Sequence, residues 1–181
     1  MTSAERLFSE RGYAAVTLRD IAGDVGIRQA TLYYHVPGGK EELFVEVTER
    51  GLARHRAGLE AAIAAAEPTL RARLQAVAQW LLAHPPLDLA RMTRSDMPAI
   101  DESHARRLTN AAFESVLLPI QRVFDSAREA GQIHPFDTTL LAGTYLSIVE
   151  GLQEARRHAP TPVLQMADDM IDVMLGGVLA R

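Results

Sequence analysis

Apolar residues recur at three- and four-residue spacings along almost the whole chain, and this helical periodicity limits the possible folds more than any other feature. No alternating polar and apolar pattern lasts for more than a few residues, so no strand of ordinary length is expected. The 181 residues, of which 48% are hydrophobic and 23% charged, have an ordinary globular balance. The sequence therefore predicts an all-α fold rather than a sheet protein or a disordered chain.

The composition excludes several classes of function. The chain has no cysteine, which excludes disulfide frameworks, thiol catalysis and cysteine-ligated zinc or iron–sulfur centres. No apolar run approaches the ~20 residues that a membrane span needs, so we expect a soluble, cytoplasmic protein with no membrane partner. A net charge of −4 argues against a general nucleic-acid coating protein, which would be strongly basic. A neutral segment can still bind DNA if its few cations lie on one face.

The first forty residues are divided into three short helices. Thr17 and Asp20 have capping-box spacing and predict the start of the second helix, which the run Val25-Gly26-Ile27 ends. A third helix is predicted over roughly residues 28–35, and the run Pro37-Gly38-Gly39 ends it. Two short helices joined by a tight turn are typical of a helix-turn-helix, in which the second helix enters the DNA major groove. The residues expected to pack these two helices together are Leu18, Ile21, Val25, Ile27 and Leu32.

The third helix offers side chains that suit base edges and phosphates. Arginine pairs with guanine, glutamine with adenine, and the methyl group of threonine with thymine. Tyrosine, histidine and lysine donors position a protein on phosphates, and free amides at a helix N-terminus such as that at Thr17 favour a phosphate oxygen. Two alternatives stay open: Tyr33 packs on the first helix, or His35 is buried between helices. The predicted DNA-binding residues are Thr17, Arg19, Arg28, Gln29, Thr31, Tyr33, Tyr34, His35 and Lys40.

Beyond these three short helices, which we call the head, the chain continues as longer helices. One is predicted from Lys40 toward Ala66, and another opens at Thr69 and ends at the prolines after His84. Residues 85–103 are the least regular part. A helix over about residues 103–130 contains Pro119, which is expected to bend it. Two strongly apolar helices follow, over residues 137–158 and from Pro160 to about Ala180. We place a helix-turn-helix domain at residues 1–45 and a helical ligand-binding and dimerisation domain at residues 46–181.

The head resembles the N-terminal domain of the TetR (tetracycline-repressor) family of bacterial regulators. The resemblance covers about forty residues at fixed spacings, namely Ala4-Glu-Arg-Leu-Phe8, Gly12-Tyr13, Thr17-Leu-Arg-Asp-Ile-Ala22, Val25-Gly-Ile27, Thr31-Leu-Tyr33-Tyr-His35 and Lys40-Glu-Glu-Leu43. It implies a three-helix DNA-binding head, a variable helical ligand domain and dimerisation through the last two helices. The sequence departs from the family pattern at Arg28, where Ser or Thr usually caps the third helix.

The resemblance also implies a ligand cavity among the middle helices. An apolar pocket with a few polar groups is the usual form of a small-molecule site. The predicted lining residues are Trp80, Met92, Met97, Phe113, Leu117, Phe124 and Tyr145, each of which can equally be ordinary core. Nothing selects among the polar candidates Gln79, His84, Arg91, His104, Asn110 and Gln121. The spacing of His84, Asp88, Asp101 and His104 does not indicate a metal site, and no cofactor is expected.

The helix-turn-helix pattern together with the family resemblance implies a homodimeric, ligand-responsive transcriptional regulator. We expect a repressor that leaves a two-fold symmetric DNA operator when an apolar or aromatic small molecule binds. The apolar helices at residues 140–152 and 163–179 would pair with those of a second copy, and recognition helices about 34–36 Å apart match successive major grooves. The alternatives are an activator of the same fold and a ligand-binding helical protein with degenerate DNA recognition. An enzyme is disfavoured because no catalytic triad order, phosphate loop or metal motif is present.

Overall fold

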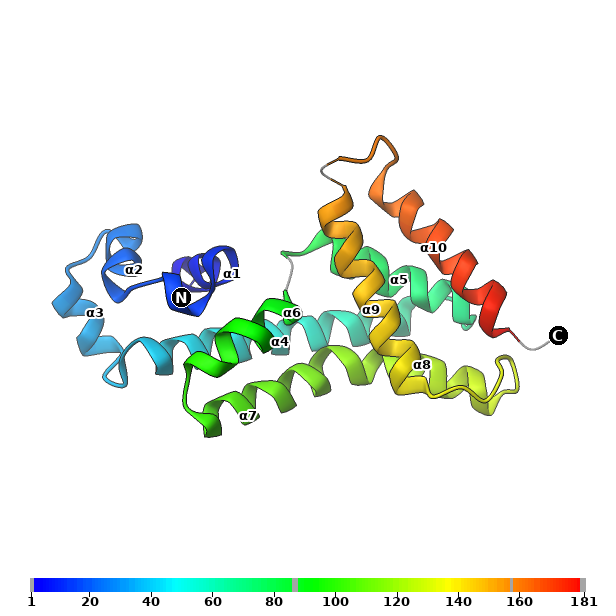
Figure 1. The fold of residues 1–181 in the computed structure, drawn as a ribbon, viewed down its shortest axis with the longest axis horizontal. Helices are drawn as coiled ribbons and strands as arrows, with labels where there is room; N and C mark the ends of the chain where they lie inside the picture. Colours follow the sequence, from blue (N-terminus) through cyan, green and yellow to red (C-terminus); the bar gives the residue numbers. More distant parts are fainter. Residues whose placement is uncertain (1, 86–87, 157, 180–181) are drawn as a thin grey trace. The chain divides into compact units, whose positions relative to one another are not determined.

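The computed structural model describes residues 2–85, 88–156 and 158–179, and helices make up its regular structure (Figure 1). In this part of the chain the β-structure is limited to an isolated bridge between Ile133 and Leu179. The predicted all-α fold is confirmed. Among the described residues, no helix combines the length and the hydropathy needed to cross a membrane.

The chain divides into two compact units. Unit 1 consists of Met1–Arg54 with Leu87–Ala112, and unit 2 consists of His55–Pro86 with Phe113–Arg181. The helices of unit 1 are α1 (Thr2–Ala15), α2 (Leu18–Val25), α3 (Gln29–His35), the first part of α4 (Gly39–Ala65), α6 (Leu89–Arg91), the π-helical turn η1 (Met92–Asp96), the 3-10 turn η2 (Met97–Ala99) and α7 (Glu102–Ala112). Unit 2 contains the end of α4, then α5 (Leu70–Ala83), the π-helical turn η3 (Phe113–Leu117), α8 (Leu118–Glu129), α9 (Thr138–Ala155) and α10 (Val163–Val178).

Local capping determines where the helices of the head begin and end. The Thr17 hydroxyl accepts the Asp20 amide at 3.1 Å, and the Asp20 carboxylate accepts the Thr17 amide at 2.8 Å, which completes the predicted capping box of α2. Gly26 ends α2 in the left-handed region with φ 76°. Arg28 is the N-cap of α3 and makes no side-chain capping hydrogen bond, as expected for a residue without a short oxygen acceptor.

The contact between α2 and α3 is narrower than the sequence predicts. Leu18, Ile21 and Leu32 are buried, but Val25 and Ile27 are exposed. The prediction that all five pack between the helices is therefore wrong for these two. Both lie beside Gly26, where the chain leaves α2 and turns toward α3, so their side chains face solvent.

Three aromatic side chains form the centre of the core beneath α1. The ring of Phe8 meets Phe44 edge-on at a centroid distance of 5.2 Å, and Tyr13 lies 5.0 Å from the same ring. Phe8 and Phe44 are almost fully buried, and Leu7 and Leu43 are buried with them. Such aromatic contacts tie α1 to the first turns of α4, which directly follow the head.

In unit 2, α9 packs on α8, and α10 packs on α5 and on α9 (Figure 1). The Tyr145 hydroxyl of α9 donates to the Leu74 carbonyl of α5 at 2.6 Å, and the tyrosine ring meets Phe124 of α8 edge-on. Burial raises the pKa of Tyr145, because the phenolate would lose its hydration. These residues fix three helices around one point.

The helix predicted over residues 103–130 has an irregular centre. It consists of α7, η3 and α8, and the wide turn η3 lies directly before Pro119. Proline has no amide hydrogen to donate and its ring clashes with the carbonyl four residues earlier. The deviation therefore falls on the turn that precedes Pro119 rather than on the proline itself.

Gly58 of α4 allows Trp80 of α5 to approach the helix backbone. A Cβ atom at Gly58 would overlap the indole ring of Trp80, which also stacks on His84 at a centroid distance of 3.7 Å. The indole is therefore held by contacts with both α4 and the end of α5. Glycine is required at this position by the close approach and not by its backbone conformation.

We predict that Gly58→Ala destabilises the protein by about 1–3 kcal/mol, because the Trp80 ring must move to admit the methyl group. Urea unfolding monitored by circular dichroism measures the loss. Gly51→Ala on the same helix is the matched control, since a Cβ there meets only ordinary contacts at 3.4 Å or more. The control is expected to gain up to about 1 kcal/mol from helix propensity. Equal stability of the two variants would contradict this role for Gly58.

Candidate nucleic-acid interface

The side chains predicted to read DNA lie on the exposed surface of α3. Gln29 and Thr31 are exposed, and Tyr34 is 85% exposed. Tyr33 is 50% exposed, and His35 is exposed with its ring edge-on to Tyr34. The alternative in which His35 is buried between helices is therefore wrong. The Tyr34 ring is so exposed that it contributes little to the packing of this unit.

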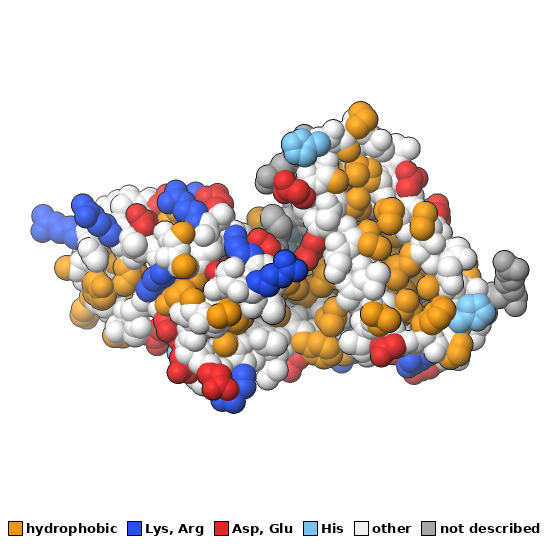
Figure 2. All heavy atoms as spheres, in the orientation of Figure 1, with side chains coloured by type: hydrophobic (Ala, Val, Ile, Leu, Met, Phe, Trp, Pro, Cys, Tyr) orange, Lys and Arg blue, Asp and Glu red, His pale blue; other side chains and the backbone are white. Residues whose placement is uncertain are grey.

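Three arginines near this surface have no carboxylate partner among the described residues: Arg11, Arg19 and Arg28. Figure 2 shows blue side chains over the end of the head that carries α2 and α3. Asp20 has a lowered pKa, mainly because it accepts the Thr17 hydroxyl and amide, with further contributions from Arg11 and Arg19. Sequence analysis missed Arg11, because no spacing in α1 singles out one exposed arginine.

Thr17 and Lys40 are engaged within the head itself. The Thr17 hydroxyl donates to Asp20 at 2.6 Å. The Lys40 ammonium lies 4.1 Å from the centre of the Tyr13 ring and 3.5 Å from the Ala14 carbonyl oxygen. Partial burial lowers the pKa of Lys40. Lys40 is only half-buried, so its cation–π contact leaves part of the ammonium open to solvent. Phosphate contacts from both residues stay predictions.

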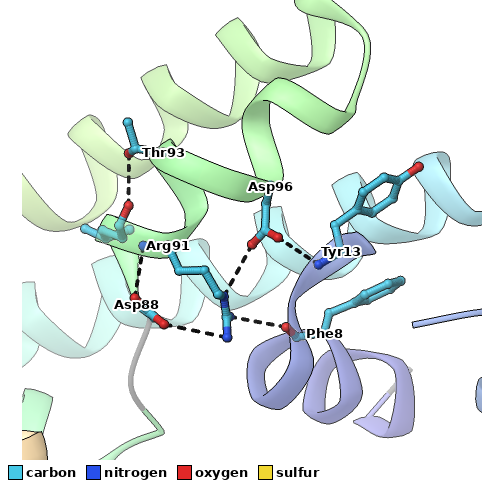
Figure 3. Close-up of polar contacts among 7 residues, drawn as sticks. Phe8, Tyr13, Asp88, Arg91, Thr93 and Asp96 are labelled. Atoms are coloured by element: carbon cyan, nitrogen blue, oxygen red, sulfur yellow. Dashed lines mark hydrogen bonds and ion pairs between the residues drawn. The ribbon is translucent and has the colours of Figure 1, made fainter. Parts of the chain in front are cut away.

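A buried carboxylate holds the kinked end of α1. Gly12 has φ 79°, which breaks the helical geometry, and the next amide, that of Tyr13, donates to Asp96 at 2.8 Å (Figure 3). Asp96 belongs to η1 and is only 4% exposed. Arg91 lies beside it, with Nε 3.6 Å from the carboxylate, and also donates to the Phe8 carbonyl at 3.3 Å. The pair therefore contacts the backbone of α1 on both sides of the kink.

The predicted ligand-binding residues are divided between the two units. Met92 and Met97 are buried in unit 1, whereas the other five belong to unit 2. Phe124 and Tyr145 are fully enclosed and contact each other, and Trp80 packs against Gly58 and His84. Phe113 is exposed and Leu117 half-buried. Two hollows of about 510 and 620 Å³ in unit 2 are lined by none of the seven.

The polar residues considered for a metal site have local partners. His104 contacts the Glu41 carboxylate at 2.7 Å, and Asp101 accepts the Ser103 amide. This hydrogen bond from His104 lowers the pKa of Glu41. Asp88 accepts the Arg91 amide at 3.0 Å and starts α6. In the described ranges no group of three or more candidate ligands comes together.

Comparison with known proteins agrees with this geometry. Residues 1–47 match the family model described as "Bacterial regulatory proteins, tetR family". The same region is 44% identical over 46 residues to the HTH-type transcriptional regulator LmrA of Bacillus subtilis, covering 25% of this chain and 24% of LmrA. It is 47% identical over 47 residues to the biofilm operon icaADBC negative regulator IcaR of Staphylococcus epidermidis, covering 26% and 25%. The match thus spans about a quarter of the length of these relatives.

The fold comparison extends over almost the whole chain. The structure of the TetR family transcriptional regulator PfmR from Thermus thermophilus matches with a TM-score of 0.73 at 24% identity, over 96% of this chain and 95% of PfmR. The chain thus combines a helix-turn-helix head with the all-α fold of this solved structure. Residues 1–47 are therefore similar to the TetR family of regulators, and the whole chain shares the fold of PfmR.

We predict that Asp96→Ala lowers the free energy of unfolding by about 1–3 kcal/mol, since it leaves the partly buried Tyr13 amide without its acceptor. Asp96→Asn keeps an acceptor oxygen but removes the charge beside Arg91, so it is expected to recover part of the loss. Denaturant unfolding of the three proteins gives both values. A stability of Asp96→Ala equal to that of the wild type would show that the hydrogen bond does not hold α1.

Proposed function

We propose that this chain is a DNA-binding transcriptional regulator whose α3 reads operator sequence. The observation that carries the proposal is the surface of the head, where the exposed side chains of α3 lie in a region with three arginines that have no carboxylate partner in the described part. Exposed polar groups on a recognition helix suit base edges, and free cations suit phosphates. The family is one of regulators rather than enzymes, which favours regulation over catalysis.

The regulator acts as a homodimer in this proposal. On α9 and α10, apolar side chains lie in solvent although their neighbours form a core: Leu140 is 67% and Val173 70% exposed, and Leu164 is also exposed. Figure 2 shows orange side chains gathered over these two helices. A second copy would cover them, because an apolar patch of this kind is typical of an interaction surface. A two-fold dimer also suits a two-fold symmetric operator.

The division of labour follows the predicted domains. Residues 1–45 would bind DNA, and residues 46–181 would dimerise and bind a small-molecule effector. A ligand can release the operator only if it binds the DNA-incompetent conformation more tightly than the competent one. The name of IcaR describes a negative regulator, which supports repression as the direction of control.

The first test is selection of binding sites from a randomised duplex library by the full chain. We expect a two-fold symmetric winner that binds at least ~10³-fold more tightly than scrambled DNA, as specific regulators do. Fluorescence anisotropy at fixed salt measures the ratio. If no sequence is enriched and binding disappears at modest salt, the protein does not read DNA, and the alternative of degenerate recognition replaces this proposal.

We predict that Tyr34→Ala and Gln29→Ala each weaken the selected site by about 1–3 kcal/mol and hardly affect random DNA, because contacts to base edges carry sequence information. Anisotropy titrations on both duplexes separate the effects. Lys40→Ala is the comparison variant, expected to weaken both duplexes alike and to lower the salt slope by about one per head. Equal weakening of both duplexes by Tyr34→Ala would contradict base reading.

A further inference from the structure

A hollow of about 510 Å³ lies within unit 2, among the end of α4, the first turns of α5 and the start of α8. Its volume falls within the range of about 300–1,000 Å³ that is usual for small-molecule sites. Its apolar walls include Ile63 and Ala64 of α4 and Pro119 and Val123 of α8. Two arginines, Arg73 and Arg122, line the same hollow.

Arg73 and Arg122 differ from three other arginines of unit 2, which have carboxylate partners. Arg56 pairs with Glu60, Arg71 with Asp172, and Arg128 with Asp125. Neither Arg73 nor Arg122 has a carboxylate partner among the described residues. Glu60 also lines the hollow, but its carboxylate is engaged by Arg56 at 3.1 Å. The hollow therefore contains two positive charges without a counter-ion from the described part of this unit.

Arg73 provides a second, independent observation. Its Nε atom is enclosed by protein and has no hydrogen-bond partner in the described part of the chain. An enclosed donor without an acceptor is unfavourable, and native proteins rarely keep one unless something else satisfies it. An anion in the hollow would not reach the enclosed Nε, but it would pair with the same guanidinium where Arg73 lines the hollow and form charge-assisted hydrogen bonds there.

We propose that this hollow binds an organic anion, with a carboxylate or phosphate head on Arg73 and Arg122 and an apolar body against the α4 and α8 walls. Guanidinium groups suit both a carboxylate and a phosphate group, because their planar fork matches two oxygen acceptors. The apolar walls favour an organic anion over an inorganic one. This inference rests on the proposed function and names the chemical class of its effector. The ligand would contact α4, the helix that directly follows the head.

The test is calorimetric titration of the full DNA-free chain with three probes of equal chain length: octanoate, octyl phosphate and 1-octanol. We expect one anion to bind per chain and to bind about tenfold or more tightly than the alcohol, because only the anions pair with the arginines. A preference for octanoate or for octyl phosphate identifies the head group. Affinities of both anions no higher than that of 1-octanol would overturn the proposal, without any variant being needed.

Substitutions then locate the site. Arg73→Met and Arg122→Met keep the aliphatic stem and are each expected to weaken the better anion about tenfold or more. Arg156→Met is the matched control, because Arg156 also lacks a carboxylate partner in the described part but does not line the hollow. It should change the affinity less than about twofold. Unchanged anion affinity in both hollow variants would place the anion elsewhere and overturn the proposal.

Operator binding separates this inference from the function on which it rests. If a selected operator is bound but neither anion binds in the hollow, the effector class is wrong and the regulator stands. If an anion binds but no operator is selected, the site stands and the regulatory function fails. When both bind, saturating anion is expected to lower operator affinity at constant salt, and no change in that affinity would contradict the role of effector.

Discussion

The hydrogen bond from the Tyr13 amide to Asp96 fixes the end of α1, and the packing of α1 on α4 depends on it. Because Gly12 leaves helical geometry, the chain after it needs an outside acceptor, and a carboxylate that is 4% exposed supplies one. The bond positions the Tyr13 ring, which contacts Phe44 and makes a cation–π contact with the Lys40 ammonium. The start of α4 is thereby tied to α1, and α3 ends only a few residues before α4 begins.

The parts of the fold that the sequence predicts well are those that depend on neighbours a few residues apart. Thr17 and Asp20 cap α2, Thr69 caps α5, and Asp137 accepts the first amides of α9, all within three residues along the chain. Asp96 accepts from an amide 83 residues away. Asp96 itself lies in a segment of short helical turns and prolines, which gives no periodic signal. A contact of that kind follows from tertiary packing, which periodicity does not encode.

In the candidate site, too, local features are predictable from the sequence and tertiary contacts are not. The helix α3 is short and buries only Leu32, so the sequence is enough to predict that its other side chains are exposed. The partners of Thr17 and Lys40 within the protein cannot be predicted from the sequence, because a residue that suits a phosphate also suits a carboxylate or an aromatic ring. Apolar residue types likewise do not distinguish a cavity wall from a core, and Phe124 and Tyr145 are core. Arg73 and Arg122 are 49 positions apart, and folding alone places them on one hollow.

Charge pairing explains how a chain with a net charge of −4 can present positive surfaces. Eighteen of its 19 basic residues are arginines, and most of those described are paired with carboxylates, as in Arg50 with Glu46 or Arg107 with Glu49. Exposed pairs of this kind add little stability, about 0–1 kcal/mol each. Their larger effect is on the field outside the protein, because a paired guanidinium attracts a distant anion weakly. Positive charge remains effective where pairing is missing, and two such places are the surface around α2 and α3 and the hollow in unit 2.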